Sequence, residues 1–404
     1  MADDLERVLK RLQHGARERA PAHDAIDAHS FFQAPNPDGG SVTVALFNDG
    51  YWAFEEVCDR LVDDLRFEYM EANDRQAAAQ AFAAAAAVQG SEDHVAAFID
   101  QHAKPILETT CSFTVEHLKI DQPREMFGAR FLPGGEARVL PYRADDALPV
   151  DAVIEVPCRG THGVRMMERA KDTAEHALRL LRAGLRDQGG PSDDYLRFRL
   201  GVQYWFTLED QTRPGWKRRP GEPLTLPVLT DELVKLATSS EVATLPQHAS
   251  ADVEQRANRA LVWWERSFLA TDAIEKVVFL FTALESILGD KDGGLKAERL
   301  SMRRAALSES LGRGFTLPER SLALYEQVRS KAIHGEKPAA VSLDQALTFE
   351  RDVRHAIDEY LLYARERDFT RRKDVRDSLV AKQREIVDFL TGANADDTTR
   401  DEGG

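Results

Sequence analysis

The pattern of apolar residues changes along the 404-residue chain near residue 245. Before this point, short runs rich in β-branched and aromatic residues alternate with helical segments, and such runs are typical of strands. From residue 252 to 392 no strand-like run occurs, and the apolar residues recur at helical spacing. We therefore predict an α+β region over 1–245, an all-α helical bundle over 246–392 and a flexible acidic tail over 393–404.

The first region mixes both kinds of element. Strands are predicted over 41–47, 111–120, 128–133, 151–158 and 195–208. Helices are predicted over 1–20, 51–103 and 164–185, and loops over 21–40 and 211–228. The order of the strands does not follow from these runs. We interpret the region as a sensing or regulatory part of one or two subdomains, joined to the bundle by a polar linker over 238–252.

The second region carries clear helix start and stop signals. Asp272 followed by Glu275 resembles a capping box and predicts the start of a helix. The loop at 289–294 ends that helix. Further helices are predicted over 295–311, 317–334, 342–368 and 372–391.

The net charge restricts the kinds of partner. The chain has 68 acidic and 53 basic residues, a formal charge of −15. Residues 1–250 hold 40 of the acidic and 28 of the basic side chains, so the acidity lies mostly in the first region. A surface that binds polyanions over its whole extent is excluded, and nucleic acid would need a local basic patch.

The cysteine count and the hydropathy favour a reducing, aqueous compartment. Cys58, Cys111 and Cys158 are odd in number and far apart in the sequence, so they predict no disulfide framework. No apolar run approaches the about 20 residues that a membrane helix needs. The amino-terminal segment is charged and lacks the apolar core of a signal peptide. We expect a cytoplasmic protein.

The common catalytic and cofactor motifs do not occur in the sequence. It contains no Walker-type phosphate loop, no GxGxxG after a strand and no GxSxG elbow. A calcium loop that would begin at Asp290 fails at its later ligand positions, and no second Cys/His pair accompanies Cys158 and His162. We predict no metal and no cofactor. Cys158 and His162 form a thiol–imidazole pair or, as we favour, Cys158 is a buried strand residue.

A short basic stretch surrounds one tryptophan. Within 213–222, Trp216 lies beside Arg218 and Arg219. Cations next to an aromatic ring suit single-stranded RNA, through phosphate charge and base stacking. A solvated turn with a packed tryptophan explains the same residues, and we favour that interpretation.

Two residues near the carboxyl end, Arg329 and His334, form a candidate catalytic pair. Gly335 and Pro338 predict that the helix before them ends at His334. The helix carboxyl end favours a positive charge on this imidazole. Arg329 lies five residues earlier, about 140° away on an ideal helix, so the two side chains converge only across a helix end or an interface. A guanidinium beside an imidazole suits a phosphodiester, because histidine moves the proton and arginine holds the developing charge.

The run from Leu324 to Gly335 resembles the R-polar-x3-H-G signature of HEPN domains, especially the Apea-like branch. FLFTALESIL at 279–288 is similar to that branch's apolar helix with an embedded glutamate, and RANRALVWWERSF at 256–268 is similar to the helix before it. The resemblance covers roughly residues 253–365. It implies a helical module that forms a homodimer and, in active members, cuts RNA without a metal, often in bacterial defence against phage.

The resemblance also implies roles for individual residues. Arg329 and His334 would be the catalytic pair, contributed by both protomers to one cleft, with Ser330 at the polar position between them. Glu285 and Tyr325 would be supporting residues, Glu285 either orienting Arg329 or being an ordinary surface carboxylate. Two alternatives stay open. His334 caps a helix while Arg329 pairs with Glu326 or Glu285, or the module is a non-catalytic dimerisation, nucleotide-binding or RNA-binding bundle.

Overall fold

The structure is a computed structural model, and it describes residues 2–18, 30–36, 38–47, 49–90, 93–134, 151–187, 196, 198–208, 211–216, 228–289, 296–313 and 318–391. The chain divides into two compact units. The first comprises Met1–Ser112, Val156–Asp172 and Tyr204–Gly215, and the second comprises Phe113–Glu155, Thr173–Gln203 and Trp216–Gly404. Each is described separately. The predicted tail at 393–404 lies outside the described residues.

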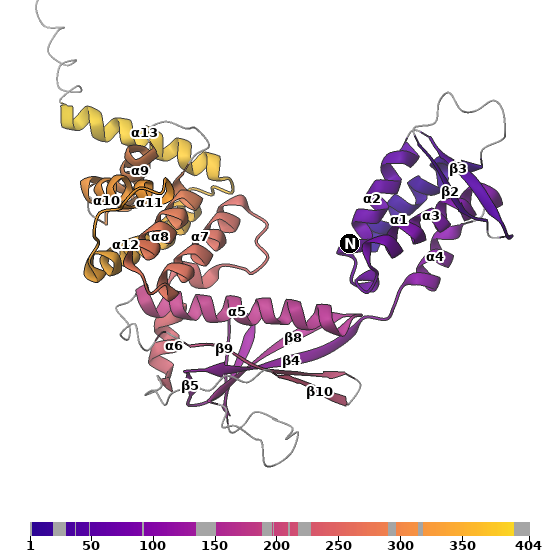
Figure 1. Ribbon diagram of the computed structural model, residues 1–404, viewed down its shortest axis with the longest axis horizontal. Coiled ribbons are helices and arrows are strands. Elements are labelled where there is room, and N and C mark those ends of the chain that lie inside the picture. Colours follow the sequence, from indigo (N-terminus) through magenta and orange to yellow (C-terminus); the bar gives the residue numbers. More distant parts are fainter. Residues whose placement is uncertain are drawn as a thin grey trace, which may run out of the picture. The chain divides into compact units, whose positions relative to one another are not determined.

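The first unit begins with a small α+β subdomain of helices packed on a sheet (Figure 1). Its helices are α1 (Ala2–Gly15), α2 (Asp49–Asp63), α3 (Ala72–Gln89) and α4 (His94–His102), with a 3₁₀ turn at Leu65–Phe67. Its strands β1 (Ala16–Glu18), β2 (Ser30–Pro35) and β3 (Ser41–Leu46) form an antiparallel sheet in the order β1-β3-β2. The loop predicted over 21–40 is therefore wrong in part, because β2 pairs with β3 and places Phe32 opposite Val44.

The core of this subdomain lies between its sheet and its helices. Apolar residues of α1 at helical spacing pack with alternate residues of β3 and with α2 and α3. The predicted helix over 51–103 is helical but broken into three pieces. The breaks have local causes, since Asp64 caps the 3₁₀ turn at Arg66 and Asp93 caps α4 at Val95.

A six-stranded sheet has the order β10-β9-β4-β8-β7-β6. Its strands are β4 (Leu107–Glu116), β6 (Arg124–Met126), β7 (Ala129–Pro133), β8 (Ala152–Gly160), β9 (Arg199–Leu208) and β10 (Gln211–Trp216). Phe127 and Gly128, both with positive φ, form the two-residue turn between β6 and β7. The short strands β5 (Lys119–Ile120) and β11 (Val228–Leu229) pair in parallel. Strand β10 occupies part of the loop predicted over 211–228.

The second unit contains the helical bundle, in orange to yellow in Figure 1. Helix α6 (Asp231–Thr238) precedes it. The bundle consists of α7 (Asp252–Leu269), α8 (Ala273–Leu288), α9 (Lys296–Ser310), α10 (Pro318–Leu324), α11 (Lys331–Ile333), α12 (Leu343–Glu366) and α13 (Arg372–Thr391). The predicted start of α8 is confirmed, because the Asp272 carboxylate accepts a hydrogen bond from Glu275 N–H at 2.8 Å. The mixed α/β first part and the helical second part both agree with the predicted fold class.

The predicted linker over 238–252 is packed structure. Residues 241–244 form a 3₁₀ turn, and both Val242 and Leu245 are buried in the core of the bundle. The Val242 N–H donates to Asp358 of α12 at 3.1 Å. Helix α5 (Gly163–Asp187) also contributes to this core through Leu180 and Ala183. The bundle core therefore recruits residues that precede 245, although the domain division there stays a prediction.

Across the described residues, no helix is both long and apolar enough to cross a membrane.

Candidate active site

The segment carrying Arg329 and His334 is helical but not uniformly α. Helix α10 passes into a π-helical turn over Tyr325–Ser330, which is followed by the short α11. The single helix predicted over 317–334 is thus interrupted at the residues of interest. A π turn includes one more residue than an α turn, and such insertions occur frequently at functional sites. It changes the direction of the side chains before it relative to those after it.

The end of this helical segment matches the sequence prediction. Gly335 has a φ of 73°, the left-handed conformation that favours glycine after a helix. The Glu336 N–H donates to the Lys331 carbonyl at 2.9 Å and the Gly335 N–H to the Ala332 carbonyl at 3.4 Å. These two bonds define a Schellman motif. His334 is therefore the last residue of the helical segment, as predicted, and it is exposed.

Arg329 is held by two side chains. Its Nη2 atom lies 2.7 Å from Oε1 and 3.0 Å from Oε2 of Glu285 on α8. The Tyr325 hydroxyl donates to Glu285 Oε1 at 3.1 Å, and the Arg329 Cζ atom lies 4.8 Å from the centre of the Tyr325 ring. Glu285 is therefore not an isolated surface carboxylate, because it positions Arg329. Of the acidic partners considered from sequence, the structure selects Glu285 and not Glu326.

Burial and charge determine the state of Tyr325. Its side chain is 6% exposed, and burial raises the pKa of its phenol to about 12, helped by the negative charge of Glu285 and opposed by Arg329. The hydroxyl consequently stays protonated and keeps donating to Glu285 throughout the neutral range.

The Arg329 guanidinium keeps free donor capacity. Its side chain is 17% exposed, and among the described side chains Glu285 binds only its Nη2 atom. A guanidinium carries five N–H donors. Arg329 can therefore bind an anion such as a phosphate while Glu285 holds it.

The other two predicted catalytic side chains are not in this cluster. None of the described side chains donates to or accepts from the His334 imidazole, so within one chain His334 and Arg329 do not contact each other through a hydrogen bond. Ser330 is half-buried, and its backbone carbonyl accepts from the His334 N–H at 3.1 Å. The structure thus brings together Arg329, Glu285 and Tyr325. The His334 imidazole has no hydrogen-bond partner among the described side chains.

The predicted RNA-binding residues fall mostly outside the described part. Arg218 and Arg219 lie outside the described residues, as does the side chain of Trp216, whose backbone ends β10. Their role stays a prediction.

The structure reveals a thiol pair that the sequence did not indicate. Cys111 on β4 and Cys158 on β8 lie on neighbouring strands, with their Sγ atoms 3.3 Å apart. The hydrogen bond from Cys111 lowers the pKa of Cys158 and raises that of Cys111. The thiol partner of Cys158 is therefore Cys111, while His162 donates its backbone N–H to Glu68 at 2.7 Å. Only the strand order, unknown from sequence, brings these cysteines together.

In the described ranges, no group of three or more His, Cys, Asp or Glu side chains could hold a metal ion. No family model, curated protein sequence or solved structure matches this chain.

Proposed function

We propose that this protein is a metal-independent endoribonuclease of the HEPN type, with Arg329 and His334 as its catalytic residues. The observation that carries the proposal is the position of Arg329. Glu285 and Tyr325 fix its guanidinium on a π-helical turn, it keeps unused N–H donors, and an exposed histidine ends the same helical segment. A fixed guanidinium is the group that stabilises charge developing on a phosphate.

The proposed reaction uses side chains that can perform each step. The ribose 2′-hydroxyl attacks the adjacent phosphorus, the bond to the 5′-oxygen breaks, and a 2′,3′-cyclic phosphate forms. One His334 accepts the proton of the 2′-hydroxyl and a second donates a proton to the departing 5′-oxygen. Arg329 stabilises the charge on the non-bridging oxygens. DNA lacks the 2′-hydroxyl and would not be cut.

The two histidines come from two copies of the chain. Arg329 and His334 make no hydrogen bond to each other among the described residues of one chain, which favours a site completed across a two-fold axis. Such a composite site is inactive in a monomer.

One observation favours a non-catalytic dimerisation or RNA-binding bundle instead. Both carboxylate oxygens of Glu285 contact Arg329, so the positive charge of the guanidinium is already compensated. A phosphate must compete with this carboxylate. In a binding module, loss of Arg329 and His334 would leave RNA affinity nearly unchanged.

The test is cleavage of a mixed RNA pool in EDTA by the purified full chain, with sequencing of the new 3′ ends. Arg329→Ala and His334→Ala are compared with His248→Ala and Arg313→Ala, which remove exposed side chains of the same types elsewhere. We expect cyclic phosphate ends from the wild type and both controls, and a loss of about 10²-fold or more in the two site variants.

Two results would contradict the proposal. Equal cleavage by the site variants would remove Arg329 and His334 from the mechanism. A strict monomer by mass photometry, at concentrations where cleavage occurs, would exclude the composite site. Absence of cleavage together with unchanged RNA affinity in all variants would favour the binding module.

A further inference from the structure

The first unit contains a cavity of about 900 Å³ at the junction of α1, β1 and the start of α2. Five basic side chains line it, namely Arg7, Lys10, Arg11, His14 and Arg17. The first four recur at spacings of three and four residues, so they lie on one face of α1. Arg17 extends this face on β1. Among the described residues, two acidic ones, Glu6 and Asp49, also line it.

Some of these cations are already paired and others are not. Arg7 contacts Asp4 at 2.7 Å, and Arg11 contacts Glu56 at 2.7 Å. Lys10 and Arg17 have no carboxylate partner among the described residues. Arg17 donates only to the Ala16 carbonyl, at 2.8 Å. Lys10 and Arg17 are therefore cations that no described carboxylate binds directly, and Glu6 and Asp49 line the same cavity.

His14 adds a hydrogen-bond acceptor to the same place. Its Nδ1 atom lies 2.7 Å from the Lys10 carbonyl, and because a carbonyl only accepts, Nδ1 carries the proton of this bond. The other ring nitrogen, Nε2, stays available to a ligand.

The wall of the cavity is shaped by a backbone contact. A Cβ atom on Gly15 would lie 2.3 Å from Gly50 Cα, and one on Gly50 would lie 2.6 Å from Gly15 Cα. The Phe47 N–H donates to the Gly15 carbonyl at 3.0 Å and the Gly50 N–H to the Phe47 carbonyl at 2.8 Å. This contact joins the α1–β1 corner to the β3–α2 corner, and the half-buried Phe47 forms an apolar part of the lining.

We propose that this cavity binds a phosphorylated small molecule of nucleotide size. Lys10 and Arg17 would bind its phosphates, His14 Nε2 would accept a hydrogen bond from the ligand, and Phe47 would contact its base. The volume lies within the about 300–1,000 Å³ that is typical of small-molecule sites. Several cations converging on one place suit more than one phosphate group.

A small ligand fits better than a nucleic acid strand. Residues 1–250 carry 40 acidic and 28 basic side chains, so a long polyanion would meet repulsion outside the cavity. A nucleotide contacts only the lining. A stripe of solvated charges on an amphipathic helix explains Lys10, but not the addition of Arg17, Phe47 and the glycine contact from other elements.

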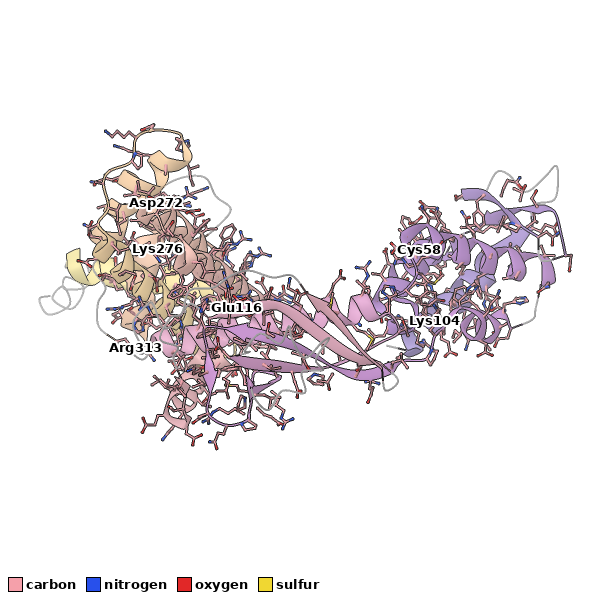
Figure 2. The ribbon with its side chains drawn as sticks, turned by 60° about the horizontal axis from the view of Figure 1, so that its bottom comes forward. Cys58, Lys104, Glu116, Asp272, Lys276 and Arg313 are labelled. Atoms are coloured by element: carbon pink, nitrogen blue, oxygen red, sulfur yellow. The ribbon has the colours of Figure 1, made fainter. Side chains whose placement is uncertain are left out.

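Isothermal titration calorimetry of the full chain with ATP, inorganic phosphate and a single-stranded RNA 10-mer tests the proposal. The variant Lys10→Ala/Arg17→Ala removes exposed side chains and leaves the buried core of α1 intact. The control Lys235→Ala/Arg313→Ala removes the same two side-chain types from the second unit, where Arg313 is labelled in Figure 2. We expect binding of ATP, weaker binding of phosphate, and a Kd for ATP at least tenfold higher in the cavity variant, with the control within twofold of wild type.

Three results would overturn it: no binding of ATP or phosphate at millimolar concentration, ATP binding unchanged in the cavity variant, or binding of the RNA 10-mer without binding of ATP. Circular dichroism shows whether the variant is folded, and the conservative Lys10→Arg/Arg17→Lys variant should retain binding. The measurement is made in the His334→Ala background, so its outcome is independent of RNA cleavage.

Discussion

Replacing Glu350 by glutamine tests whether buried charges hold α5 to the helical bundle. Glu350 on α12 is fully buried. Its Oε1 atom forms an ion pair with Nε of Arg186 on α5, at 3.0 Å. Lys276 of α8, labelled in Figure 2, reaches the other oxygen at 3.2 Å. Both cations are only 5% exposed, so the carboxylate of Glu350 contributes to compensating two buried positive charges.

The size of the effect follows from this burial. Removing one member of a buried ion pair leaves an uncompensated charge and costs about 3–5 kcal/mol. Glutamine retains the shape of glutamate but not its charge, and its amide nitrogen faces a cation. We expect a loss of about 3 kcal/mol or more in the free energy of unfolding of the bundle, which is about 100-fold in its opening equilibrium.

Hydrogen exchange, measured by mass spectrometry on peptides from α5, α7 and α12, gives the free energy of unfolding of the second unit alone. Glu366→Gln is the matched control, because Glu366 lies on the same helix, is half exposed and contacts Arg367 at 3.6 Å. We expect the control to change stability by less than about 0.5 kcal/mol. Lys276→Met/Glu350→Gln leaves one buried cation instead of two and should lose less than Glu350→Gln.

A loss below about 1 kcal/mol for Glu350→Gln, or a loss equal to that of the control, would refute the reasoning. It would mean that water or a rearranged side chain compensates the two cations. Helix α5 would then be held mainly by its apolar residues.

Two further perturbations test particular contacts. Gly184→Ala would normally stabilise a helix, but its Cβ would lie 2.1 Å from the Ala237 carbonyl oxygen, so we expect a loss of about 1–3 kcal/mol and a lower Tm by calorimetry; a raised Tm would contradict the close packing of α5 on α6. Burial lowers the pKa of His176 below 6.5, so the unfolded chain takes up the proton first, and stability present above pH 6.5 is lost as the pH falls below it. Urea midpoints at pH 7.5 and 5.5 should differ less in His176→Gln than in wild type, and an unchanged difference would exclude this histidine as the cause.

Helix ends were predicted where neighbouring residues determine them. Gly335 ends the segment after His334, and Asp272 starts α8, because a positive φ and a side-chain cap act over four or five residues. The strands at 41–47 and 151–158 also follow from local composition. The segment 238–252, predicted as a linker, is packed through Val242, whose N–H donates to Asp358, 116 residues away. Its polar composition does not indicate this contact.

In the candidate site, too, some features were predicted from the sequence and others were not. The sequence identified Arg329 and His334 by their place before a helix end, and by resemblance it named Glu285 and Tyr325. It left open whether Glu285 binds Arg329, because the two lie 44 residues apart and on different helices. The π turn at Tyr325–Ser330 has no local signal in the sequence. Its Tyr325 and Arg329 side chains contact Glu285 on α8.

The sequence by itself determined the class of each half, the ends of the main helices and the types of residue available for chemistry. These properties depend on hydrogen bonds and apolar spacing within a few residues. The tertiary structure decided which residues meet: Cys111 with Cys158, Arg186 with Glu350, Arg329 with Glu285, and Gly15 with Gly50. Those contacts join residues distant in the chain, and only the packing of whole elements into a core selects them.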